Sequence, residues 1–226
     1  MGGHLALEVL RRAPSPAPCA RGHGILGFAV ADLGPLWLRT AKMGVHDAVR
    51  TASPSSWNKG EPMAELTHLD EKLAEVLGLA QAAQVATKKV ATLARKEKET
   101  ELVALMQKMS EQAAQVQARC EEVAGTRDGM KTAIAAKARE TKAEVTGFMK
   151  TYLEDAEALD GLEFLSMTEA GEMAHWEILA ALNETANDRD VAAVVKFAVP
   201  LQTAHVAAVR EHSLRLAADE DTSEPA

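Results

Sequence analysis

Apolar residues recur every three or four positions along the last third of the chain, residues 161 to 217. This spacing places them on one face of an α-helix, and the run is long enough for two helices. Between the two stretches, Asn187 suits a helix C-terminus, and Asp188 or Asp190 suits the N-cap of the next helix. The pattern therefore predicts two helices folded back on one another as an antiparallel hairpin.

Both predicted helices carry polar side chains where the apolar stripe predicts core. Glu169, Glu172 and His175 lie between leucines on the first helix, and Gln202 and His205 interrupt the second. A turn centred near residue 187 sets Glu169 opposite His205. The same turn sets Glu172 opposite Gln202. The sequence thus predicts a layer of polar groups inside the hairpin.

Three further helices are predicted upstream of the hairpin. Apolar stripes run over residues 66–95 and 102–125, with the charged cluster 95–101 between them. Residues 130–153 form a more charged helix that is long enough to cross from one hairpin to the other. The pattern predicts an all-α four-helix bundle, made of two antiparallel hairpins joined by a crossover helix, over residues 63–218.

The last helix contains a proline, Pro200, close to His205. A proline inside a helix removes one backbone hydrogen bond and bends the helix. Alternatively, Pro200 marks a helix start after a break at Phe197. The pattern leaves both interpretations open.

Residues 1–62 differ in character from the rest. They hold most of the prolines and end in the turn-forming run TASPSSWNKGEP, after which Met63 opens a clear helix start. We interpret them as a disordered leader or an over-extended start, and residues 219–226 as an acidic disordered tail. The most apolar window, GILGFAVADLGPLWL, is interrupted by Asp32 and Pro35 and is too short for a membrane helix.

The amino-acid composition favours helical structure and argues against some classes of binding partner. Hydrophobic residues make up 47% of the chain and aromatic residues only 4%, and alanine, leucine and valine favour helix. The formal net charge of −8 argues against a general affinity for nucleic acid or an anionic membrane. Cys19 and Cys120 lie in regions of different character, so a reducing, cytoplasmic location is predicted without a structural disulfide.

The order hairpin, crossover helix, hairpin resembles the ferritin-like superfamily, and more narrowly a group of bacterial stress-associated ferritin-like proteins. The resemblance covers roughly residues 63–218. It rests on the helix start LDEKLAEVL, on the crossover segment, and on AHWEILAAL around His175. It implies a ferritin-like bundle that binds iron or manganese, pairs as a homodimer, and serves stress response or metal handling.

The metal ligands that this resemblance implies are Glu169, Glu172, His175 and His205. Glu172-x-x-His175 has the spacing with which inward-facing helices of such bundles hold metal. The last helix, however, offers Gln202 where a carboxylate is expected, and a neutral amide is a poor ligand for iron. Each histidine also fits a hydrogen-bonded structural role in the core.

The first two helices depart further from the family pattern. Glu71 matches the family position best but lies off the leucine stripe, while Glu111 lies beside the second stripe and Gln115 stands where the family tends to keep a histidine. No phosphate loop, nucleophile elbow or Cys-x-x-Cys motif is present, which favours a non-enzymatic role. Two hypotheses remain: a ferritin-like protein with a reduced metal site, and a metal-free bundle that acts as a structural or interaction module.

Overall fold

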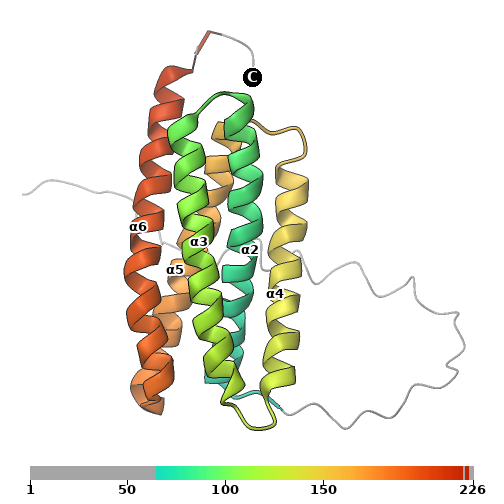
Figure 1. Cartoon of the computed structure of the whole chain (residues 1–226), viewed down its shortest axis with the longest axis vertical. Coiled ribbons are helices and arrows are strands. Elements are labelled where there is room, and N and C mark those ends of the chain that lie inside the picture. The colour runs from blue at the N-terminus through green and yellow to red at the C-terminus, as the bar shows by residue number, and fades with distance from the viewer. Residues whose placement is uncertain (1–64, 221, 224–226) are drawn as a thin grey trace, which may run out of the picture. The chain divides into compact units, whose positions relative to one another are not determined.

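A computed structural model describes residues 65–220 and 222–223. These residues form helices only, which run up and down along a common axis (Figure 1). The helices are α2 (His68–Lys96), α3 (Thr100–Gly125), α4 (Lys131–Tyr152), α5 (Ala158–Ala186) and α6 (Arg189–Asp219). The interpretation of residues 1–62, with their apolar window and Cys19, lies outside the described residues, as does half of the tail 219–226.

Helix α2 is the central element of the bundle. It packs against α3, α4 and α5, while α6 contacts α5 and α3. Helices α2, α3, α5 and α6 therefore enclose the core, and α4 covers α2 from outside (Figure 1). The prediction of an all-α helical bundle is confirmed for this part of the chain.

The apolar core is divided into two clusters. One includes Trp176 and Leu179 and lies near the turn between α5 and α6. The other includes Phe164 and Leu165 and lies near the beginning of α5. The polar positions of α5 and α6 fall between these clusters, so the core is interrupted near its middle.

The close packing of α4 on α2 depends on Gly78. A Cβ atom at this position would lie 2.5 Å from the carbonyl oxygen of Ala138 and 2.7 Å from Cβ of Thr141. Both distances are shorter than van der Waals contact, so only glycine lets the two helices approach this closely.

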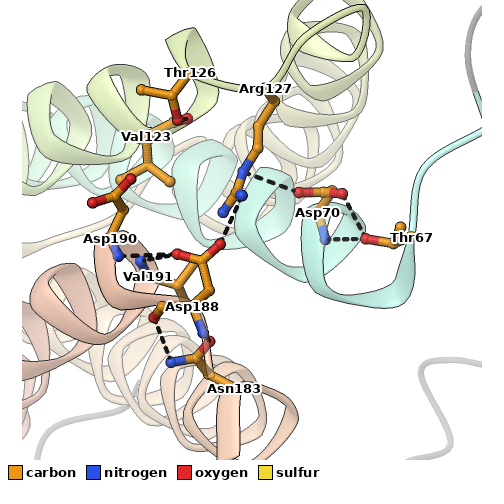
Figure 2. Close-up of polar contacts among 9 residues, drawn as sticks. All are labelled: Thr67, Asp70, Val123, Thr126, Arg127, Asn183, Asp188, Asp190 and Val191. Atoms are coloured by element: carbon orange, nitrogen blue, oxygen red, sulfur yellow. Dashed lines mark hydrogen bonds and ion pairs between the residues drawn. The ribbon is translucent and has the colours of Figure 1, made fainter. Parts of the chain in front are cut away.

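An arginine ties three segments together at the end of the bundle where α5 turns into α6 (Figure 2). Nη1 of Arg127 lies 2.7 Å from Oδ2 of Asp188, and Nε lies 3.4 Å from Oδ1 of Asp70. Asp188 also accepts hydrogen bonds from the backbone N–H groups of Asp190 and Val191, which caps α6. Burial tends to raise the pKa of Asp188, but these hydrogen bonds and Arg127 outweigh it and lower that pKa.

The predicted turn between α5 and α6 is confirmed. Asn187 takes the left-handed conformation with φ of 53°, and Asp188 is the N-cap of α6. The side chain of Asn183 closes the turn, because it accepts from the backbone N–H of Asp188 and donates to its carbonyl oxygen.

The helices of the structure differ from the predicted helices in two details. Helix α2 begins at His68 and not at residue 66, because the hydroxyl of Thr67 accepts the backbone N–H of Asp70 and caps the helix. Pro200 lies inside α6, which continues without a break across Phe197. The interpretation of Pro200 as a helix start is therefore wrong.

Candidate functional site

Glu169 of α5 is the centre of a polar layer between the two apolar clusters. It is 2% exposed, and its Oε2 accepts a 2.6 Å hydrogen bond from Nε2 of Gln202. The same oxygen lies 3.4 Å from Nδ1 of His205. Gln202 also donates to the backbone carbonyl of Glu169 at 3.1 Å. Two side chains of α6 therefore hold this carboxylate.

The predicted facing of Glu169 and His205 is confirmed, whereas the predicted pair of Glu172 and Gln202 is wrong. Gln202 bonds Glu169 instead. Gln202 precedes His205 by three positions on α6, so both side chains lie on the same helix face and reach the same carboxylate.

His205 links α5 to α3. Its Nε2 lies 2.9 Å from Oε1 of Gln112, while its other ring nitrogen faces Glu169. An amide oxygen can only accept, so Nε2 carries the proton in this contact.

Gln112 was missed from the sequence, although a signal for it exists. It follows Met109 by three positions and precedes Val116 by four, so it shares the helical stripe of those two buried residues. Glu111 and Gln115, the positions singled out on this helix, are both exposed. The resemblance therefore directed attention to the wrong side of α3.

Glu172 is buried one turn further along α5. Its Oε1 accepts a 3.3 Å hydrogen bond from the indole N–H of Trp176. Burial, and then the charge of Glu169, raise the pKa of Glu172 to about 8, against the effect of that hydrogen bond. Its carboxyl group is therefore protonated at neutral pH. Burial, and then Glu172, also raise the pKa of the nearby Cys120, which remains a neutral thiol.

His175 does not join this layer. Its Nδ1 lies 3.3 Å from Oε2 of Glu75 and 3.5 Å from Nζ of Lys72, both on α2. Burial, and then the charge of Lys72, lower the pKa of His175 although Glu75 raises it. The two residues of the Glu172-x-x-His175 motif therefore lie in different places, with Glu172 in the core and His175 beside α2. Glu71, the other acid considered on α2, is only partly buried.

The described residues do not supply the ligand set of a ferritin-like di-metal centre. Among them, no group of three or more histidine, cysteine, aspartate or glutamate side chains is arranged to hold a metal ion. Glu169 and His205 remain as a pair, and amide groups of Gln112 and Gln202 complete their surroundings.

Comparisons of the chain with protein-family models, with curated proteins and with solved structures found no match. Among the described helices, α6 is long and apolar enough to cross a membrane by length and composition alone. This property is weak evidence for a membrane-spanning helix, because the core helices of bundles meet the same criterion.

Proposed function

We propose that the protein is a cytoplasmic, ferritin-like bundle without a metal centre, which acts as a structural or protein-interaction module. The outer surface of α5 carries this proposal. Met167 and Ile178 are 47% and 46% exposed there, and small apolar residues fill the space between them. We call this surface the α5 outer face; it comprises Met167, Ala170, Gly171, Ala174, Ile178 and Ala181.

The composition of α5 supports an interaction role. The helix buries Leu165, Trp176 and Leu179 on one side and exposes the α5 outer face on the other, beside the exposed acids Glu163, Glu177 and Glu184. Contiguous exposed apolar surface marks a site of association in soluble proteins. The α5 outer face is therefore the surface on which a partner is expected.

The contacts within the polar layer support the proposal that the bundle needs no metal ion. The carboxylate of Glu169 is held by Gln202 and faces His205, and Glu172 receives the indole N–H of Trp176. Because burial keeps Glu172 protonated at neutral pH, its carboxyl group adds no negative charge to the layer. Buried polar groups need such partners, and here the chain itself supplies them.

A photo-reactive amino acid tests the interaction role. Placed at Ile178, it is expected to form a covalent protein adduct when the full chain is irradiated in its native cells. The same amino acid at Ala118, exposed on α3, is the matched control and is expected to give none. Gel mobility and mass spectrometry detect the adducts. Absence of an adduct from position 178, or equal adducts from both positions, contradicts the proposal.

A reduced metal site is the second candidate, and one distance favours it. Ligand atoms about 2.0–2.1 Å from a tetrahedral zinc ion lie about 3.3–3.4 Å apart. Oε2 of Glu169 and Nδ1 of His205 are separated by 3.4 Å. In this alternative, Glu169 and His205, assisted by Glu172, hold a divalent ion such as iron, manganese or zinc. The protein then handles metal within the stress response that the resemblance implies.

Thermal unfolding separates the two candidates. The metal-free proposal expects an unchanged melting temperature when ferrous, manganous or zinc ions are added to chelator-treated protein. A bound ion at a hundredfold excess over its Kd would instead add about 2.7 kcal/mol of stability. A rise that is lost in His205→Ala but kept in His175→Ala would establish the metal site, since His175 lies beside Glu75 on α2. Such binding would weaken below about pH 6, where an imidazole becomes protonated.

A further inference from the structure

Four residues of the α5 outer face, Met167, Gly171, Ala174 and Ile178, have the same order of sizes in both directions. Met167 and Ile178, eleven positions apart, lie on one line of the helix because roughly three turns separate them. Gly171 and Ala174 lie between them. An antiparallel copy of α5 would set Met167 against Ile178 and Gly171 against Ala174. These four positions are thus complementary to one another across a two-fold axis, as a two-fold interface requires.

Gly171 is not required for packing among the described residues. A Cβ atom at this position would meet no other atom within 4 Å, whereas one at Gly78 would collide with α4. A glycine inside a helix costs about 1 kcal/mol relative to alanine. Gly147 of α4 also faces open space, but charged residues such as Lys150 lie near it on that helix. Only at Gly171 does the glycine lie within an apolar face, where it lets another helix approach closely.

The charges beside the face favour an antiparallel arrangement. Helix α5 contains no lysine or arginine, and Glu184 is exposed near its end. Because Glu169 lies opposite His205, the exposed Arg210 of α6 lies level with the beginning of α5. In an antiparallel pair, the beginning of one α5 lies beside the end of the other. Arg210 of one copy then comes close to Glu184 of the second copy.

We propose that the α5 outer face is the contact surface of a symmetric homodimer, in which the α5 helices of two copies pack antiparallel. This inference rests on the proposed interaction role and specifies the partner as a second copy of the chain. A lipid bilayer is a less suitable partner for this face. The exposed acids Glu177 and Glu184 lie on the same helix, and burying them in lipid is costly.

Sedimentation of the full chain tests this dimer. The wild type is expected to sediment as a dimer, and Ala174→Arg as a monomer with unchanged helicity by circular dichroism. Ala114→Arg, the same change on the exposed side of α3, is the matched control and is expected to remain dimeric. A monomeric wild type at tens of micromolar, or a dimeric Ala174→Arg variant, overturns the inference.

Charge reversal tests the antiparallel direction. Glu184→Arg and Arg210→Glu are each expected to raise the dimer Kd roughly tenfold, because a two-fold interface contains each pair twice and reversal replaces attraction by repulsion. The double variant exchanges the two charges and is expected to return the Kd to near the wild-type value. Failure of the double variant to recover overturns this arrangement.

The photo-adduct formed from position 178 distinguishes the inference from the broader proposal. An adduct with the mass of two chains agrees with both. An adduct with a different protein leaves the interaction role standing and overturns the homodimer. The absence of any adduct overturns both.

Discussion

Truncation of Leu179 to alanine is expected to lower the free energy of unfolding by about 2–5 kcal/mol. The side chain of Leu179 is 0% exposed and belongs to the apolar cluster that contains Trp176. Removing its isobutyl group loses burial of apolar surface and leaves a cavity that neighbouring helices cannot fill completely. Urea unfolding followed by circular dichroism measures the difference.

Leu201→Ala is the matched control for this change. Leu201 lies on the apolar stripe of α6 and packs against the same cluster, but it is only partly buried. Its truncation is expected to cost less than half as much, because part of the removed surface already contacts water. Equal costs for the two leucines would contradict this account of the core.

These two leucines show how far an apolar pattern predicts burial. Periodicity identifies the face of a helix that points inward, and it located Leu179 and Leu201 equally well. It does not show which side of that face a neighbouring helix covers. The helix ends were more predictable, because the capping groups of Asn187 and Asp188 act within a few residues of sequence.

The candidate site was predictable only where its contacts stay within the α5–α6 hairpin. Glu169 and His205 lie on facing stripes of consecutive helices, so their approach followed from the turn. His175 was placed with them because of its spacing from Glu172. Three residues leave a net offset of roughly 60° around the helix, and this offset is enough to place His175 at the edge of the face, next to α2. Beside α2 it meets Glu75.

Contacts between distant helices could not be read from the chain. Gln112 reaches His205 from α3, and Lys72 reaches His175 from α2. Both depend on how far one helix is displaced along another, which no turn between neighbouring helices determines. The same limitation concealed Arg127, whose pairing with Asp70 and Asp188 joins three separate segments.

Replacement of Glu172 with glutamine is expected to leave stability nearly unchanged at acid pH and to increase it at alkaline pH. The pKa of Glu172 is about 8 in the folded protein, against 4.5 for the free group. Below about pH 4 the group is protonated in both the folded and the unfolded chain. As the pH rises towards 8, the unfolded chain ionises while the folded chain keeps its proton, so the wild type loses stability.

Above pH 8 this loss is complete and amounts to something on the order of 3–5 kcal/mol, because each unit of pKa difference corresponds to about 1.4 kcal/mol. Glutamine preserves the shape of the side chain and an oxygen that accepts the indole N–H of Trp176. It does not ionise, so the variant is expected to be more stable than the wild type at pH 9.

Urea unfolding of chelator-treated protein between pH 5 and pH 9 measures this difference. Glu177→Gln, at an exposed position on the same helix, is the control and is expected to follow the wild type at every pH. Equal stabilities of Glu172→Gln and the wild type at pH 9 would show that Glu172 ionises freely. In that case a second negative charge would lie beside Glu169 in the core, and the polar layer would need a cation after all.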